Sequence, residues 1–400
     1  MGRDFLSRRV LELEPSATMA MSAKAKKLAA EGKNVISFSV GEPDFNTPKH
    51  ICEAAKKAID AGMHGYTAVG GIPELRKAIA EQFLRDIGVE YQPNQIVASP
   101  GGKYSLYLTL MAMINPGDEV IIPAPYWVSY PEMVRLVGGV PVFVETREKD
   151  LFAVTPAEVE AAITPRTKMM ILNSPSNPSG QIIPPENIEE IGRILEKKNI
   201  WCLSDEIYNK LIFGEARHKS VASVSDYCRE HTIVVNGCSK TYAMTGWRMG
   251  WIGATRDLAQ AIEDLQGQTC SNPCSIAQAA AVAALNGPQD CVSEMAAKFD
   301  ERRKIIYKLL NEIPGFSMDM PQGAFYALPN ISKLFGKNIA GKLVRNPKDF
   351  CSIALEMVHV AMVPGESFGA PDHVRLSYAT SEENIVEGCR RLKDLVGDDI

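Results

Sequence analysis

The chain has 400 residues and a formal net charge of −5, without a block of basic residues, so nucleic acid is not expected as a partner. Its 46% apolar and 23% charged residues describe a soluble globular protein, and its length predicts two domains. The longest apolar runs have the length of a strand, which argues against a membrane span. The first 17 residues lack the continuous hydrophobic core of a secretory signal.

The nine cysteines are an odd number and lie scattered along the chain. This usage fits a reducing compartment better than a disulfide framework, so we expect a cytoplasmic protein. Cys270 and Cys274 are closely spaced but lack a second pair of ligands nearby, so we expect no metal site.

The N-terminal part reads as helices separated by one strand. Residues 16–32 have a helical pattern, and residues 35–40 alternate like a strand that breaks at Gly41. A proline at the start and a glycine at the end predict a helix over residues 49–61, and a second helix opens at Pro73.

From residue 96 onward, strands and helices alternate regularly. The strands are near-continuous apolar runs, expected at residues 96–98, 119–122, 140–144, 169–172, 200–203, 232–235 and 251–254. Such runs between helices predict an α/β domain with a mostly parallel, seven-stranded sheet covered on both faces. Ligands then bind at the carboxyl ends of the strands.

Beyond residue 276 the pattern changes to longer helices and shorter strands. Helices are expected over residues 276–285, 289–311, 347–357 and 382–395, with short strands near residues 316, 324–328, 360–363 and 374–377. This pattern predicts a smaller α+β domain completed by the N-terminal residues. We assign residues 48–288 to the large domain, and residues 1–47 and 289–400 to the small one.

The stretch 236–253 follows a β-branched strand and contains Lys240 and Arg248. A lysine among Cys238, Tyr242, Met244 and Trp247 is partly desolvated, which disfavours its charge and makes the amine a better nucleophile. The arginine supplies a fixed cation suited to phosphate.

The pattern S-K-x-x-x-x-T-G-W-R-x-G in this stretch resembles the Schiff-base segment of class I pyridoxal-phosphate aminotransferases. Further matching motifs are V-G-G-I-P-E-L-R, P-G-G-K, A-P-Y-W-V-S-Y-P-E and V-R-L-S-Y-A-T-S-E-E-N, in the expected order. They are most similar to the bacterial and plastid branch of aspartate aminotransferases, some of which use prephenate or arogenate. The resemblance implies pyridoxal 5′-phosphate as cofactor and the fold type I of these transferases.

By this resemblance Lys240 would carry the cofactor and move a proton during the reaction. Asp205, at the end of a strand, would face the cofactor's pyridine nitrogen and keep it protonated. Tyr208 and Asn177 match the residues that hold the phenolic oxygen.

The cofactor phosphate needs donors. Gly101, Gly102 and Lys103 open a helix directly after a strand, where backbone amides and the helix dipole favour an anion, and Arg248 would join them. The family often has a hydroxyl three residues before the lysine, where this chain has Gly237. Tyr66 matches a tyrosine that reaches the neighbouring subunit's phosphate, which implies a homodimer with shared sites.

The substrate side is also implied by the family. Trp127 would stack on the cofactor, and Gly41 lies where the N-terminal segment closes on substrate. Arg375 sits in an apolar strand, where a buried arginine needs either a structural acid or a ligand, and it matches the family's carboxylate-binding arginine. Lys103 matches a lysine that binds the distal carboxylate in this branch of the family. Residues 267–276, where other aspartate aminotransferases supply an arginine for that role, contain no cation.

These residues predict a ping-pong aminotransferase that moves the amino group of an amino acid, best L-aspartate, to 2-oxoglutarate. Ile72 stands where prephenate-using members tend to have threonine, which disfavours that activity. The alternatives are an aromatic, prephenate or other amino-acid aminotransferase, or a β-lyase, of the same fold. A non-catalytic amino-acid sensor is a further alternative, but the intact catalytic residues argue against it.

Overall fold

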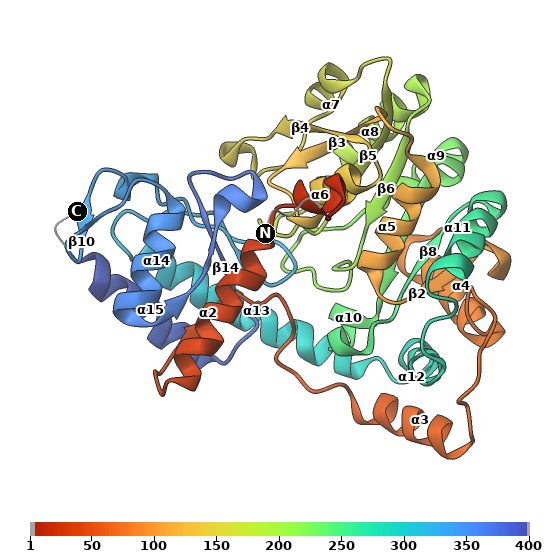
Figure 1. Ribbon diagram of the computed structural model, residues 1–400, viewed down its shortest axis with the longest axis horizontal. Coiled ribbons are helices and arrows are strands. Elements are labelled where there is room, and N and C mark those ends of the chain that lie inside the picture. Colours follow the sequence, from red (N-terminus) through yellow and green to blue (C-terminus); the bar gives the residue numbers. More distant parts are fainter. Residues whose placement is uncertain (1–4, 398–400) are drawn as a thin grey trace.

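The computed structural model describes residues 5–397 and contains two bodies side by side (Figure 1). The larger body is built on a seven-stranded sheet, and the smaller one holds three short sheets. Within residues 5–397, no helix combines the length and the apolar character needed to cross a membrane. The nine cysteines are all free.

The large sheet has the strand order β2-β8-β7-β6-β5-β3-β4. β8 alone runs opposite to the other six strands, so the predicted mostly parallel sheet is confirmed. The strands are β2 (Ile96–Ser99), β3 (Glu119–Ala124), β4 (Val140–Glu145), β5 (Thr167–Asn173), β6 (Trp201–Asp205), β7 (Thr232–Gly237) and β8 (Gly250–Gly253).

Helices cover both faces of this sheet (Figure 1). Successive residues of a strand point to opposite faces, and accordingly Ile122 of β3 packs in one core with α5, α6 and α11 while Ile121 packs in another with α7, α8 and α9. The helices of this body are α3 (Lys49–Asp60), α4 (Pro73–Ile87), α5 (Gly102–Met113), α6 (Ser129–Leu136), α7 (Pro156–Ala162), α8 (Pro185–Lys198), α9 (Asp226–His231), α10 (Cys238–Thr241), α11 (Arg256–Thr269) and α12 (Ser275–Asn286).

The smaller body combines both ends of the described chain. Its antiparallel sheet has the order β13-β14-β9, and β1 pairs with β12 in parallel, Ile36 opposite Val360. One apolar core therefore contains residues from the N-terminal segment and from the last hundred residues. The strands are β1 (Ile36–Ser37), β9 (Tyr326–Ala327), β10 (Asn338–Ile339), β11 (Lys342–Leu343), β12 (Val360–Ala361), β13 (Val363–Pro364) and β14 (Val374–Ser377); the helices are α1 (Arg8–Leu11), α2 (Ala17–Ala30), α13 (Asp290–Asn311), α14 (Pro347–Val358) and α15 (Glu382–Val396).

Two sequence predictions need correction. The strand expected over residues 35–40 is only β1, because its parallel pairing with β12 ends at Ser37 and Ala361. No strand forms near Phe316; the neighbouring Ser317 makes a single bridge with Asn330. Helices α1, α9, α10 and α11 and strands β10 and β11 were not predicted.

Candidate active site

A cavity of about 280 Å³ lies at the carboxyl edge of the large sheet. Loops after β5 and β6, the starts of α5 and α10, and β14 of the smaller body all contribute to its wall. The lining includes ten of the residues expected from the sequence: Gly41, Gly102, Lys103, Trp127, Asn177, Asp205, Tyr208, Lys240, Arg248 and Arg375.

Lys240 lies on α10, the short helix that directly follows the buried strand β7. Its Nζ donates to the Gly41 carbonyl at 2.6 Å. Burial lowers the pKa of Lys240 to about 8, assisted by Arg375 and Arg248 and opposed by Glu42 and Asp205. A lowered pKa increases the neutral, nucleophilic fraction of the amine at neutral pH.

Asp205 ends β6 and is 5% exposed. The Tyr130 hydroxyl donates to its Oδ2 at 2.7 Å, and the Ile207 amide donates to Oδ1 at 3.3 Å. Burial raises the pKa of Asp205 to about 6, although both hydrogen bonds oppose this rise. A cationic partner in the cavity would restore the charge of this carboxylate. Tyr130 was not predicted from the sequence.

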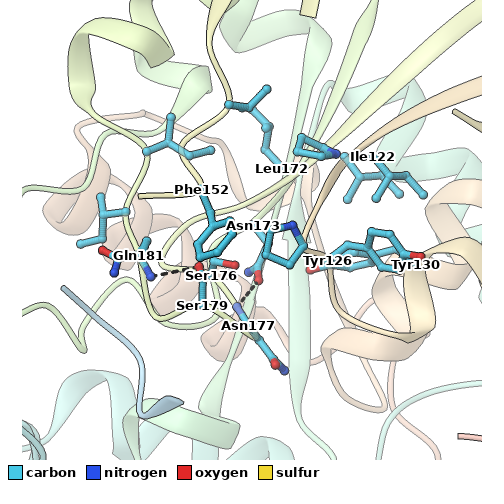
Figure 2. Close-up of a pocket in the computed structure, with 16 residues that line it drawn as sticks. Ile122, Tyr126, Tyr130, Phe152, Leu172, Asn173, Ser176, Asn177, Ser179 and Gln181 are labelled. Carbon is cyan, nitrogen blue, oxygen red and sulfur yellow. Dashed lines mark hydrogen bonds between the residues drawn. The ribbon is translucent and has the colours of Figure 1, made fainter. Parts of the chain in front are cut away.

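The loop after β5 lines this cavity through Asn173 and Asn177, which also line the neighbouring pocket drawn in Figure 2. The Asn173 Oδ1 accepts from the Asn177 amide at 2.9 Å, and its Nδ2 donates to the Asp205 carbonyl at 3.0 Å. Asn173 therefore ties the ends of the neighbouring strands β5 and β6 together, and it too was missed by sequence reasoning.

Arg375 is 2% exposed on β14. It donates to the Asn177 side chain at 3.1 Å and to the Ser39 carbonyl at 2.7 Å, and its Nε has no hydrogen-bond partner among the described residues. No carboxylate within residues 5–397 forms an ion pair with it. Since a buried, uncompensated charge is costly, the guanidinium is suited to an anionic ligand.

The side of the cavity at the start of α5 is shaped by Gly101. Gly101 has a φ of +92°, and a Cβ there would lie 2.4 Å from Nη2 of Arg248. The guanidinium therefore rests against the start of α5, where free amides favour an anion. Arg248 itself is held by a 2.8 Å bond to the Thr245 carbonyl.

Gly237 has a steric reason for departing from the family pattern. A Cβ at this position would lie 2.7 Å from the Met249 carbonyl oxygen and 2.9 Å from the Gly250 Cα. The antiparallel contact of β7 with β8 thus leaves no room for a hydroxyl-bearing side chain.

On another wall, the Lys103 ammonium lies 4.7 Å from the centroid of the Trp127 ring. Partial desolvation and the Arg248 guanidinium lower the pKa of Lys103. A cation held over an aromatic face remains available to a carboxylate.

Two expected residues stand apart from this cavity. Tyr66 is 92% exposed and does not line it, and Gly101 is not among the lining residues although it lies against Arg248. Conversely, Ser16, Thr18 and Met19 at the start of α2 line the cavity. The sequence analysis expected the N-terminal segment to close on the substrate at Gly41, but it did not predict these three residues.

Fold and site together place a buried amine of lowered pKa, a buried carboxyl and a buried guanidinium around one cavity at the carboxyl edge of an α/β sheet. A family model described as "Aminotransferase class I and II" matches residues 33–392. The chain is 47% identical to an aspartate aminotransferase of Geobacillus stearothermophilus over 387 residues (97% of this chain, 98% of the relative). It is 46% identical to an aspartate/prephenate aminotransferase of Cereibacter sphaeroides over 391 residues (97% and 98%).

Among solved structures, an aspartate aminotransferase from Thermus thermophilus with maleate superposes with a TM-score of 0.92 at 40% identity (98% of this chain, 99% of that chain). The chain therefore belongs to the class I and II aminotransferases, and it is a pyridoxal-phosphate-dependent enzyme. Its cavity fits that cofactor: it offers an amine of lowered pKa, a buried carboxyl and a helix start beside a guanidinium.

Proposed function

We propose that the protein transfers the amino group of L-aspartate to 2-oxoglutarate by a ping-pong mechanism. The observation that carries this proposal is the buried Arg375 guanidinium, which no carboxylate among the described residues neutralises. Lys103 provides a second cation in the wall of the same cavity. A dicarboxylic amino or 2-oxo acid can satisfy both cations at once.

Each residue then has a role. When bound, pyridoxal phosphate withdraws electron density from the substrate's Cα. Lys240 holds the cofactor and moves a proton at that carbon, and its pKa of about 8 suits it to general base work near neutral pH. The carboxylate of Asp205, oriented by Tyr130, keeps a proton on the pyridine nitrogen.

The remaining residues bind and orient. Tyr208 and Asn177 hold the cofactor's phenolic oxygen, and Trp127 stacks on its ring. Gly101, Gly102 and Arg248 hold the phosphate. Arg375 binds the α-carboxylate of the substrate, Lys103 the distal carboxylate, and Gly41 closes over the bound substrate.

The alternatives are an aminotransferase for aromatic amino acids, prephenate or other donors, or a β-lyase on the same scaffold. A relative at 46% identity is named for both aspartate and prephenate, so identity alone does not separate these substrates. The deciding experiment is a panel of aspartate, glutamate, phenylalanine, alanine and arogenate as donors with matched 2-oxo acids, prephenate included, compared by kcat/KM. A kcat/KM for phenylalanine or arogenate above that for aspartate would refute the aspartate assignment. Pyruvate released from cysteine conjugates without an acceptor would identify a lyase.

We further propose a homodimer in the cytoplasm. The support for the dimer is Tyr66, whose side chain is 92% exposed in the single chain and is free to reach a partner's phosphate site. Nine free cysteines support a reducing compartment. Light scattering and cofactor affinity, both measured on the wild type and on Tyr66→Phe, test the shared site. We expect Tyr66→Phe to bind the cofactor more weakly than the wild type while its mass stays that of a dimer. A monomer in solution contradicts the proposal.

A further inference from the structure

Tyr326 of β9 lines the cavity but has no role in the mechanism above. It is 1% exposed. Tyr326 pairs directly with Ser377 of β14, so its side chain is on the same sheet face as that of Arg375, two residues away. The strand register therefore brings Tyr326 to the guanidinium.

The hydroxyl of Tyr326 has one hydrogen-bond partner in the described part of the chain, the Tyr208 hydroxyl at 2.8 Å. Gly41 packs against the same hydroxyl, since a Cβ at Gly41 would lie 2.3 Å from the hydroxyl oxygen of Tyr326. Tyr326 thus contacts both the residue proposed to hold the cofactor's phenolic oxygen and the residue whose carbonyl receives the Lys240 ammonium.

The ring of Tyr326 has a second, separate contact. The Arg375 guanidinium carbon lies 4.8 Å from the centroid of this ring and 4.8 Å from that of Phe368. Two aromatic faces thus hold the charge by cation–π attraction. This arrangement fixes the plane of the guanidinium without occupying the donors that a carboxylate needs.

We propose that Tyr326 is a positioning residue with two separable parts: its hydroxyl polarises Tyr208, and its ring orients Arg375 for the substrate carboxylate. This inference rests on the proposed roles of Tyr208 and Arg375. When Tyr208 donates to the cofactor's phenolic oxygen, its own oxygen accepts from Tyr326. Hydrogen bonds in such a chain strengthen one another, so Tyr208 becomes a better donor.

Three variants separate the two parts. Tyr326→Phe removes the hydroxyl and keeps the ring, and Tyr326→Leu removes both. Tyr378→Phe is the matched control, because Tyr378 is a fully buried tyrosine of the same core whose hydroxyl bonds the Ala324 carbonyl outside the cavity. Each purified holoenzyme is titrated with pH while the visible absorbance of the bound cofactor is followed. Binding of maleate, a non-reacting dicarboxylate, is measured by calorimetry.

For Tyr326→Phe we expect the midpoint of the absorbance titration to move upward, in the same direction as in Tyr208→Phe but less. Its kcat should fall about three- to tenfold, as for loss of one hydrogen bond, while maleate affinity changes less than about twofold. Tyr326→Leu should additionally weaken maleate about five- to thirtyfold, because the cation–π contact is lost. Tyr378→Phe should leave the midpoint and maleate affinity unchanged.

Three results would overturn the inference. The first is an unchanged midpoint of the absorbance titration in Tyr326→Phe when Tyr208→Phe does shift it. The second is an equal loss of maleate affinity in Tyr326→Phe and Tyr326→Leu. The third is a change in midpoint or maleate affinity in Tyr378→Phe as large as in the Tyr326 variants. If Tyr326→Leu does not fold, Tyr326→Phe and the control still decide the hydroxyl's role. An unmoved midpoint in Tyr208→Phe itself would instead refute the cofactor role proposed for Tyr208.

Discussion

The Lys240 ammonium donates to the Gly41 carbonyl at 2.6 Å across 199 residues of sequence. This bond joins the reactive amine of the large body to the segment that follows β1 in the small body. The amine is therefore held by a single backbone oxygen, with its charge disfavoured by burial. Under the proposed role of Lys240, capture of the cofactor requires the neutral amine and the release of this hydrogen bond.

The first prediction concerns the pH dependence of that capture. With a pKa of about 8 rather than 10.5, about a tenth of Lys240 is neutral at pH 7, against about 0.03% for an ordinary lysine. The rate of covalent cofactor binding to the cofactor-free enzyme should rise with pH and level off above about pH 8. Stopped-flow absorbance gives this profile. A rate still rising tenfold per pH unit at pH 9.5 would contradict it.

Lys240→Ala should retain the cofactor noncovalently and lose nearly all turnover, by more than about 10²-fold.

The second prediction concerns Asp205. Its pKa is raised to about 6 in the folded protein, so between about pH 4 and pH 6 the native state binds more protons than the unfolded state. The free energy of unfolding of the cofactor-free protein therefore falls as pH rises through this window, by up to about 3 kcal/mol. Asp205→Asn removes that cost, so it should raise Tm at pH 8 while giving no gain below pH 4.

The same substitution should lower kcat far more than it changes substrate affinity, because the carboxylate acts on the transition state. Steady-state kinetics with aspartate measures this effect. An unchanged kcat would make Asp205 a structural residue only.

The third prediction uses two glycines with nearly the same positive φ. Gly101 and Gly117 have φ values of +92° and +93°, so an alanine at either costs about 1 kcal/mol or more in backbone strain. Only at Gly101 would the new methyl displace the Arg248 guanidinium; nothing lies within 4 Å of the Cβ position at Gly117. Gly101→Ala should weaken cofactor affinity at least about tenfold more than Gly117→Ala at similar Tm. Equal affinities, measured by equilibrium dialysis, would remove Arg248 from the phosphate site.

The seven strands of the large sheet were predictable because each is a short apolar run between helices, a pattern that depends only on neighbouring residues. Lys240, Asp205 and Arg375 were also found, since a charged residue in or after a buried strand stands out in the sequence. The family then supplied their expected roles.

Tyr130, Asn173 and Tyr326 were missed for a different reason. Tyr130 reaches Asp205 across 75 residues, and Tyr326 meets Arg375 through the register of two strands. Each looks like an ordinary core or loop residue in the sequence, because its partner is set by packing. The antiparallel β8 likewise depends on its position between β2 and β7, which no local pattern encodes.

The last prediction concerns substrate selection by Lys103. Its ammonium lies over the Trp127 ring in the cavity wall, and dicarboxylic substrates need a cation beyond the one offered by Arg375. Lys103 also lies close enough to Arg248 for that guanidinium to lower the pKa of Lys103, so it could instead serve the phosphate. Lys103→Ala separates the two roles, and Lys103→Arg is the control that keeps the charge.

If Lys103 binds the distal carboxylate, the alanine variant should lose about ten- to a hundredfold in kcat/KM for aspartate and 2-oxoglutarate, the value of one charge-assisted hydrogen bond. Phenylalanine and alanine as donors should be affected less than about threefold, because they lack that carboxylate. Lys103→Arg should recover part of the loss for aspartate only. Equal losses for dicarboxylic and neutral donors, together with weakened cofactor affinity, would assign the lysine to the phosphate. The selectivity for aspartate would then have to come from another residue of the cavity wall. Ser16, the N-cap of α2, and Thr18 within α2 offer polar side chains in that wall.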